Sequence, residues 1–270
     1  MIRVFVGCAS GDDLESQAVL EYTLRKYASE PVEIVWMQLS RDPSSPFYSN
    51  GLSGWQTKNW STPFSGLRWA VPSLCGYQGK AIYTDSDVIF RADVAELWHQ
   101  TFEQGKCIIA KGGRDSWRFC VSLFDCEAIY PHILPAPELR KPNSHQEMIA
   151  RFRNSKLIQP FRGAWNVIDG EDFANIRDSK IKLIHYSDES AQPHLRFAVP
   201  RLANEGRRHW FDGKTRLHWR ADLIQLFDQL LREATSAGFY VDKYRPRFPF
   251  GDYRIQNHGG YTGHRFSAKV

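Results

Sequence analysis

The first forty residues follow a strand, loop, helix, strand pattern that constrains the fold more than any other part of the sequence. β-Branched and aromatic residues fill 2–6 and 32–36, and 14–27 has the apolar spacing of a helix. This order predicts an α/β fold with a mainly parallel central sheet flanked by helices. Ligands of such sheets lie beyond the carboxyl ends of the strands, where the polar loop 7–13 falls.

Later segments continue the alternation of strands and helices. Further strands are expected at 80–84, 88–90, 107–110, 119–124 and 180–186. Helices are expected at 65–75, interrupted by Pro72, at 93–98 behind a capping Asp93, at 146–152, and at 219–237, ended by Gly238. The stretch 40–66 is rich in Ser, Pro, Gly, Asn and Trp without periodicity, which predicts a long loop over a site.

Composition and cysteine usage favour a globular cytoplasmic protein. The 270 residues are 42% hydrophobic, enough for a sizeable core. No stretch approaches the roughly 20 consecutive apolar residues of a membrane-spanning helix, and the N-terminus begins with a strand pattern instead of a signal peptide. Five cysteines without paired spacing predict reduced thiols, with neither a disulfide framework nor a zinc site.

Basic residues are concentrated in the C-terminal quarter. Residues 194–270 carry 14 Lys and Arg against 7 Asp and Glu. A basic, aromatic surface of this kind suits phosphate-rich partners or a peripheral contact with an anionic membrane, and it is equally typical of a solvated face. No nucleic-acid recognition motif accompanies it, so nucleic acid is not an expected partner.

The triplet Asp85-Ser86-Asp87 follows directly on the strand pattern of 80–84. Carboxylates two residues apart on an extended chain point to the same side, so they can hold one hard divalent cation beside a diphosphate. The cation would neutralise the charge that builds on a departing diphosphate. The same triplet is typical of a polar turn with capping aspartates, and these residues by themselves leave both interpretations open.

The surroundings of the triplet resemble the donor site of glycosyltransferase family 8 and its bacterial relatives. The similar segments, in the family's order, are the first strand and nucleotide-binding loop (3–7), the arginine-bearing helix (64–68), the Asp-X-Asp segment (80–98), the glutamine of an Asp-Gln pair (Gln146), the Trp-Asn segment (163–167) and the closing His-Tyr motif (184–193). Together they cover about residues 1–195.

The resemblance implies a retaining glycosyltransferase with a GT-A fold, acting in the synthesis of bacterial cell-surface polysaccharide. The implied partners are a UDP-sugar donor and a saccharide or glycolipid acceptor. Residues 1–195 would form the nucleotide-sugar-binding catalytic domain, and 196–270 a helical, basic, aromatic extension packed on the same domain. The protein would be cytoplasmic, with a possible peripheral contact at the inner membrane through the basic C-terminus.

The resemblance also assigns roles to individual residues. The implied ligands of Mn²⁺ or Mg²⁺ are Asp85, Asp87 and His185. The implied contacts to the nucleotide sugar are Gly7, Arg68, Asp85 and Gln192. The implied catalytic residues are Asp87 and Gln146, the latter beneath the reacting sugar, where its amide can stabilise positive charge near the anomeric carbon.

Several positions depart from the family's pattern. His145 replaces the aspartate before Gln146, which removes a carboxylate from the sugar pocket. Gln192 replaces the lysine before Pro193, so a cation for the diphosphate would come from elsewhere, for example Arg196. The strand segment 118–120 reads Arg-Phe-Cys where the family often has Asn-X-Gly, and the loop 7–13 resembles the family's Gly-Tyr-Asp only loosely.

Two other functions are compatible with the same fold and metal use. A sugar nucleotidyltransferase would share both, although such enzymes typically carry a Gly-rich N-terminal phosphate loop with basic residues, which this sequence lacks. A module that binds nucleotide sugar or carbohydrate without catalysis is compatible with the substitutions at 145 and 192. No nucleophile elbow, Walker loop or His-Glu-X-X-His motif points to another chemistry.

Overall fold

The computed structural model of the chain describes residues 1–113, 116–172 and 175–251. The last part of the expected C-terminal extension, 252–270, lies outside the described residues. Among the described helices, none combines the length and the apolar character needed to cross a bilayer.

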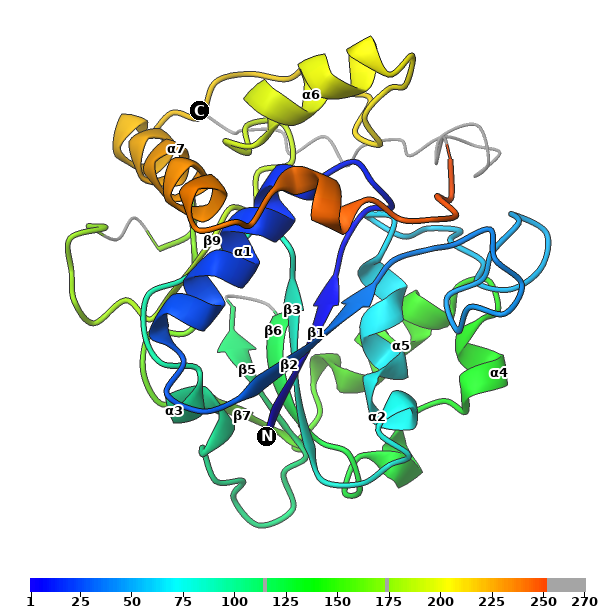
Figure 1. Ribbon diagram of the computed structural model, residues 1–270. Helices are drawn as coiled ribbons and strands as arrows, with labels where there is room; N and C mark the ends of the chain where they lie inside the picture. The colour runs from blue at the N-terminus through cyan, green and yellow to red at the C-terminus, as the bar shows by residue number, and fades with distance from the viewer. Residues whose placement is uncertain (114–115, 173–174, 252–270) are drawn as a thin grey trace.

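A six-stranded sheet forms the centre of the molecule (Figure 1). Its strands, in spatial order, are β2 (Val32–Met37), β1 (Ile2–Gly7), β3 (Lys80–Asp85), β6 (Trp117–Asp125), β5 (Ile108–Gly112) and β7 (Ile158–Pro160). The pairs β1–β2, β1–β3 and β5–β7 are parallel, whereas β6 is antiparallel to both β3 and β5. All strands except β6 therefore share one direction, which confirms the predicted mainly parallel sheet.

Side chains alternate between the two faces of this sheet, and both faces are covered. Val4, Val6 and Ile82 pack in one core with residues of α1 (Leu14–Tyr27). Phe5 and Tyr83 point the other way, into a core that contains side chains of η1 (Ser65–Ala70), α2 (Val71–Leu74) and α5 (Ser144–Arg153). The sheet is thus the middle layer of three, as expected when βαβ units place helices over a parallel sheet.

A second, three-stranded sheet lies beside the end of β3. Its order is β4 (Val88–Phe90), β9 (Leu183–His185), β8 (Val167–Ile168), with β4–β9 antiparallel and β8–β9 parallel. The register sets Val88 opposite His185. Strand β9 is shorter than the predicted strand 180–186, because Asp178 closes a turn by accepting a hydrogen bond from the Lys180 amide at 2.9 Å.

The remaining elements are mostly short. They are α3 (Ala95–Trp98), η2 (Tyr130–His132), α4 (Ala136–Leu139), α6 (Leu195–Asn204), α7 (Ala221–Ser236) and η3 (Val241–Tyr244). Asp93 precedes α3, whose N-cap is Val94, and its Oδ1 accepts the amide of Ala95, the first residue of the helix, at 2.9 Å. Gly238, which follows α7, has the positive φ of +86° that favours glycine.

One prediction about helices was wrong, and one helix was not predicted. Pro72 does not interrupt a helix over 65–75: the segment is a 3-10 turn followed by α2, and Pro72 occupies the first turn of α2, where a missing N–H costs nothing. Helix α6 was not predicted, because Pro200 lies inside it. The long stretch 40–66 contains no regular helix or strand before η1, as expected.

The C-terminal part of the described chain is held on the domain by two histidines in the same sequence pattern, His-Trp-X. The Nε2 atom of His209 contacts Asp13 Oδ1 at 2.7 Å, and that of His218 contacts Asp169 Oδ2 at 2.7 Å. In each ring Nδ1 accepts the backbone N–H two residues ahead, so Nε2 carries the hydrogen and donates to the carboxylate. All four side chains are buried.

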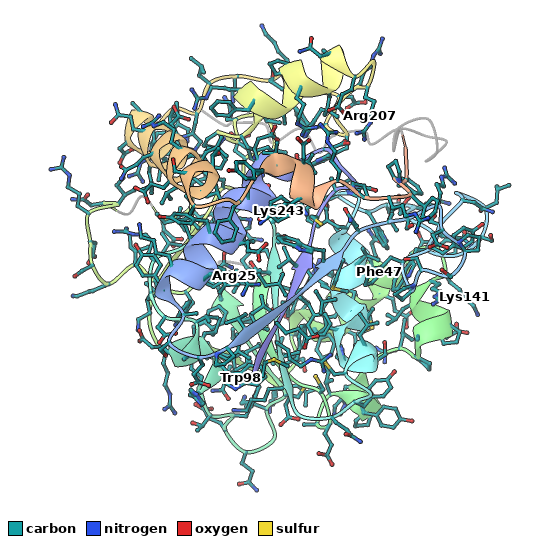
Figure 2. The ribbon with its side chains drawn as sticks, in the orientation of Figure 1. Arg25, Phe47, Trp98, Lys141, Arg207 and Lys243 are labelled. Atoms are coloured by element: carbon teal, nitrogen blue, oxygen red, sulfur yellow. The ribbon has the colours of Figure 1, made fainter. Side chains whose placement is uncertain are left out.

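Charged pairs add to these contacts at the loop between β1 and α1 and at the first turn of α1. Arg201 of α6 donates two hydrogen bonds to Glu15, at 2.7 and 3.0 Å. Arg207, which follows α6 (Figure 2), donates to Asp12 at 2.7 Å. Described residues that follow the predicted boundary at 195 therefore contact the loop that leaves β1 and the start of α1, while the division into a domain and an extension stays a prediction.

Replacing Asp169 by alanine is expected to lower the free energy of unfolding by about 3 kcal/mol, because it leaves the buried donor of His218 and the half-buried donors of Ser187 without this acceptor. Urea denaturation measures the change. Asp212→Ala, at an exposed position of the same C-terminal part, is the control and should change the stability little. Equal stabilities of the two variants would contradict this role of Asp169.

Candidate functional site

The two aspartates of the triplet lie at the carboxyl end of β3. Asp85 is the last residue of that strand, and Asp87 directly precedes β4. Pairing of β4 with β9 brings His185 beside them, with its Nε2 atom 3.2 Å from Asp87 Oδ1. Nitrogen and oxygen atoms of His185 and Asp85 also lie within 4.8 Å of one another. The structure thus brings His185 close to each of the two carboxylates that were predicted to bind a metal with it.

Neighbouring side chains hold these ligands in fixed orientations. Gln192 Nε2 donates to Asp87 Oδ2 at 2.6 Å, and Asn166 Oδ1 contacts His185 Nδ1 at 3.0 Å. Because Asn166 Oδ1 can only accept, His185 Nδ1 carries the hydrogen, and the other ring nitrogen, Nε2, faces the carboxylates.

One oxygen at the site accepts no hydrogen bond. Asp87 Oδ1 is buried and accepts no hydrogen bond within the described chain, although His185 Nε2 is close. A buried carboxylate oxygen without a donor is costly unless a positive group approaches it. The residues therefore fit a divalent cation, which would be held by oxygen and nitrogen donors of the kind that Mn²⁺, Mg²⁺ and Zn²⁺ accept.

Asp85 is part of a buried pair with Arg68. Arg68 Nη2 lies 3.2 and 3.3 Å from the two carboxylate oxygens, and the Tyr83 hydroxyl donates to Oδ1 at 2.6 Å. Burial raises the pKa of Asp85 above its ordinary value, while the Arg68 charge acts in the opposite direction. Burial disfavours the protonated ring of His185, yet Cys120 and Asp87 beside it raise its pKa above the ordinary value.

Gly7 is required at the site for a steric reason. It pairs with Asp85 across β1 and β3, and a Cβ atom there would lie 2.2 Å from the Tyr83 hydroxyl oxygen and 3.0 Å from the Phe64 ring. A side chain would push Tyr83 away from Asp85. Beyond Gly7 the loop borders a small pocket, lined by Ala9, Ser10, Asp12, Leu39, Pro63, Trp210, Phe250 and Gly251. The predicted contact between Gly7 and a nucleotide stays a prediction.

His145 and Gln146 lie in the first turn of helix α5, and their side chains have different partners. Gln146 is partly exposed and its Nε2 donates to the carbonyl of Asn59, so its predicted catalytic role stays a prediction. His145 is buried, and its Nδ1 accepts the Trp69 indole N–H at 3.0 Å. Burial, with a further contribution from the Arg68 charge, lowers the pKa of His145 to about 3.

Two expectations about positive charge at the site are changed by the structure. The amide nitrogen of Gln192 donates to Asp87 and, at 2.7 Å, to the Tyr186 carbonyl, so the side chain orients a predicted ligand. Its direct contact with the nucleotide sugar stays a prediction. Arg196 forms an ion pair with Asp228 of α7. This pairing gives no support to Arg196 as the substitute for the family's lysine.

Sequence reasoning missed three residues at the site. Tyr83 lies two residues before Asp85 on β3, so strand alternation could have placed both on one face. Asn166 has a φ of +70°, which asparagine tolerates better than most residues and which directs its amide toward His185. Cys120 of β6, noted in the sequence only as a departure, lies beside His185 and Asp85.

The structure contains a second group of possible ligand atoms, in Asp13, His194 and His209. Asp13 Oδ1 already faces His194 Nε2 at 2.9 Å and His209 Nε2 at 2.7 Å, and Oδ2 accepts the Trp210 indole N–H at 2.9 Å. The hydrogen on His209 Nε2 blocks a cation there. We assign this group to hydrogen bonding that fixes the β1–α1 loop.

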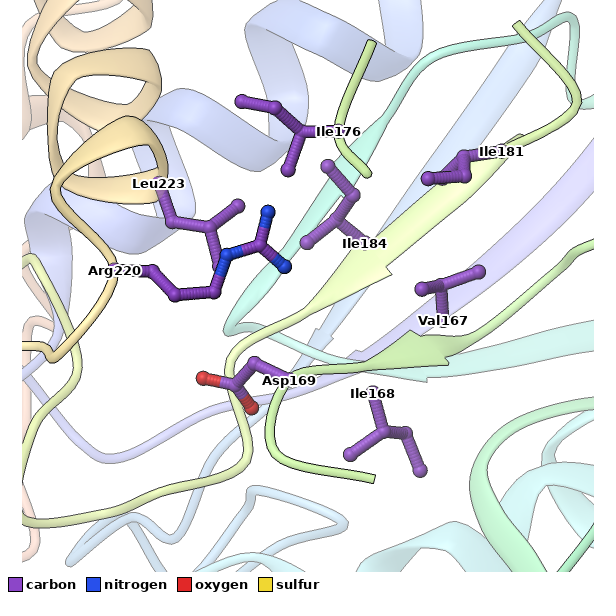
Figure 3. A pocket seen from close by; sticks show the side chains of 8 residues that line it. All are labelled: Val167, Ile168, Asp169, Ile176, Ile181, Ile184, Arg220 and Leu223. Carbon is purple, nitrogen blue, oxygen red and sulfur yellow. The ribbon is translucent and has the colours of Figure 1, made fainter. Parts of the chain in front are cut away.

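Figure 3 shows an apolar pocket next to the smaller sheet. Residues of β8, β9 and the start of α7 line it, with the polar groups of Asp169 and Arg220 on one side: Val167, Ile168, Asp169, Ile176, Ile181, Ile184, Arg220 and Leu223. Asp169 faces His218 and Ser187, so this pocket belongs to the attachment of the C-terminal part and contains no candidate ligand of the carboxylate site.

Sequence comparison finds one relative that matches part of this chain. No protein-family model matches the sequence. Protein CDI of Arabidopsis thaliana is 35% identical over 97 residues, which are 35% of this chain and 35% of that protein. The match thus spans about a third of the length of this curated relative.

Comparison with solved structures identifies the fold. The bifunctional glycosyltransferase WbbM matches 90% of this chain and 51% of its own, with 13% identity and a TM-score of 0.56. The galactosyltransferase LgtC, in complex with donor and acceptor sugar analogs, matches 86% and 96%, with 10% identity and a TM-score of 0.53. GlyE of Streptococcus pneumoniae TIGR4 matches 88% and 64%, with 12% identity and a TM-score of 0.52. The chain has the GT-A fold of these glycosyltransferases and spans about half of WbbM.

The low pKa of His145 predicts a pH-dependent part of the stability. The unfolded chain protonates this histidine below its ordinary pKa of 6.5, the folded chain only below about 3, so stability is complete above pH 6.5 and falls as the pH decreases toward 3. The total loss is on the order of 5 kcal/mol. In His145→Gln, urea denaturation between pH 7 and pH 4 is expected to give a shallower fall than in the wild type. Equal slopes would contradict the assignment.

Proposed function

We propose that this protein is a metal-dependent glycosyltransferase that moves a sugar from a UDP-sugar to a saccharide or lipid-linked acceptor. The observation that carries the proposal is the convergence of Asp85, Asp87 and His185, with the unpartnered Asp87 oxygen, at the carboxyl end of β3 in a GT-A fold. That LgtC was solved with donor and acceptor sugar analogs supports sugar substrates for a chain of this fold.

The chemistry assigned to a bound cation is neutralisation of the charge on the departing diphosphate. The protein's contribution is orientation. Gln192 and Asn166 fix the rotamers of Asp87 and His185, so that the donor atoms are in place before the substrate arrives. Arg68 adds a permanent positive charge beside Asp85 that suits the phosphate oxygens of the donor.

We propose transfer with retention of anomeric configuration, without an enzyme nucleophile. The acceptor oxygen forms its bond to the anomeric carbon on the face from which the diphosphate leaves, the bond from that carbon to the diphosphate oxygen breaks, and the acceptor proton passes to the leaving diphosphate. The Gln146 amide would stabilise the positive charge that develops at the sugar. Its partly exposed position at the start of α5 is compatible with a contact that forms only when the donor binds.

The acceptor is proposed to belong to bacterial cell-surface polysaccharide synthesis, with the protein in the cytoplasm and in peripheral contact with the inner membrane. Exposed aromatic residues in the basic C-terminal part support such a contact: Trp219 is 56% exposed, Tyr240 57% and Phe248 45%. Rings of this kind sit at the level of lipid headgroups, where basic residues meet anionic lipids.

Replacing Asp87 by alanine is expected to lower Mn²⁺-dependent hydrolysis of a UDP-sugar by at least about a hundredfold, because the cation loses a ligand that carries charge. A screen of UDP-sugars with purified protein first identifies a hydrolysed donor. Asp212→Ala serves as the control and should retain wild-type rates, and circular dichroism confirms the fold of both variants. Full activity of Asp87→Ala would overturn the role of this residue at the metal.

The same assay separates the alternative functions. A sugar nucleotidyltransferase would release diphosphate from a nucleoside triphosphate and a sugar phosphate, without hydrolysing UDP-sugars. A binding module that has lost catalysis would bind UDP in a metal-dependent manner without turnover. Calorimetric titration with UDP, with and without Mn²⁺, distinguishes this outcome from the absence of any nucleotide site.

A further inference from the structure

Cys120 has the position of a ligand at the carboxylate site. Its sulfur, on strand β6, lies within 4.8 Å of ligand atoms of both Asp85 and His185, which in turn lie within 4.8 Å of each other. Atoms bound to one ion at about 2.0–2.3 Å are separated by less than about 4.6 Å, so small side-chain movements bring all three to a common centre. Asp87 Oδ1, the unpartnered oxygen, faces the same histidine nitrogen.

A single side chain orients both the histidine and the thiol. Asn166 Oδ1 lies 3.0 Å from His185 Nδ1, and Asn166 Nδ2 donates to Cys120 Sγ at 3.2 Å. The first contact fixes the tautomer in which Nε2 can bind a cation, and the second stabilises negative charge on the sulfur. Asn166 is buried and held in a left-handed backbone conformation, so its amide has a defined direction.

We propose that Cys120 is a fourth protein ligand of this cation site and that the site therefore prefers cations that accept sulfur, such as Zn²⁺, Co²⁺ and Cd²⁺, over Mg²⁺. This inference rests on the metal site of the proposed function and specifies its ligand set. On binding, the thiol releases its proton to solvent and a sulfur–metal bond forms. Thiolate and imidazole ligands favour such cations, whereas Mg²⁺ favours oxygen donors.

The test is a titration of the full chain with Co²⁺, followed by absorption spectroscopy. The wild type is expected to show visible bands of bound Co²⁺ together with a near-ultraviolet sulfur-to-cobalt charge-transfer band. In Cys120→Ser the visible bands should remain and the charge-transfer band should disappear. Cd²⁺ affinity should fall roughly tenfold or more in this variant, with a much smaller change for Mg²⁺.

A matched control variant and a measurement on the wild-type protein complete the experiment. Cys75→Ser removes another partly buried thiol and should retain the charge-transfer band. Cadmium-113 NMR of the wild type should show a resonance coupled to the β protons of Cys120. This measurement uses no variant, so its result does not depend on how well a variant folds.

The outcomes separate this inference from the proposed function. Bound Co²⁺ without a charge-transfer band, a band that survives in Cys120→Ser, or a band lost in Cys75→Ser would each overturn the role of Cys120. If these results came with Mn²⁺-dependent hydrolysis of a UDP-sugar, the proposed function would stand. A wild-type chain that binds no Co²⁺ and shows no metal-dependent hydrolysis would overturn both.

Discussion

The antiparallel pairing of β4 with β9 is the interaction on which the candidate site depends. It joins residues almost a hundred positions apart, sets Val88 opposite His185, and is extended by the hydrogen bond from the Tyr186 amide to the Asp87 carbonyl at 3.0 Å. This pairing places His185 beside the aspartates at the end of β3. The short sheet thus adds a histidine nitrogen to the two neighbouring carboxylates of the candidate site.

A second constraint comes from the end of the chain. The loop after β1 carries two adjacent aspartates, and both are held by residues of the C-terminal part: Arg207 and the Trp210 amide at Asp12, and His209 and the Trp210 indole at Asp13. In parallel α/β folds this loop is where a ligand approaches the sheet. The conformation of the loop therefore depends on residues that follow the predicted domain boundary at 195.

Sequence patterns predicted the elements that are determined by the spacing of residues close together in the chain. The strands around β1 and β3, helix α1 and the carboxylate pair followed from alternation and helical spacing, and the family resemblance added His185. Contacts that depend on tertiary packing could not be predicted in this way. Gln192 was assigned to the nucleotide sugar and contacts Asp87, Gly7 makes room for Tyr83, and α6 forms despite Pro200 because neighbouring elements bury its apolar side.

Two departures from the family 8 pattern, Gln192 and Cys120, lie next to the candidate site in the structure. Replacement of the lysine by Gln192 removes a positive charge and supplies a neutral donor to Asp87, while a cysteine in place of glycine adds a donor atom within reach of His185. Both changes involve side chains of the proposed cation site, and Asn166 contacts both His185 and Cys120. A site that was losing its function would be expected to leave ligands unsupported. Here Gln192 and Cys120 each have a partner at the site, which supports the proposal of an altered metal environment over a degenerate one.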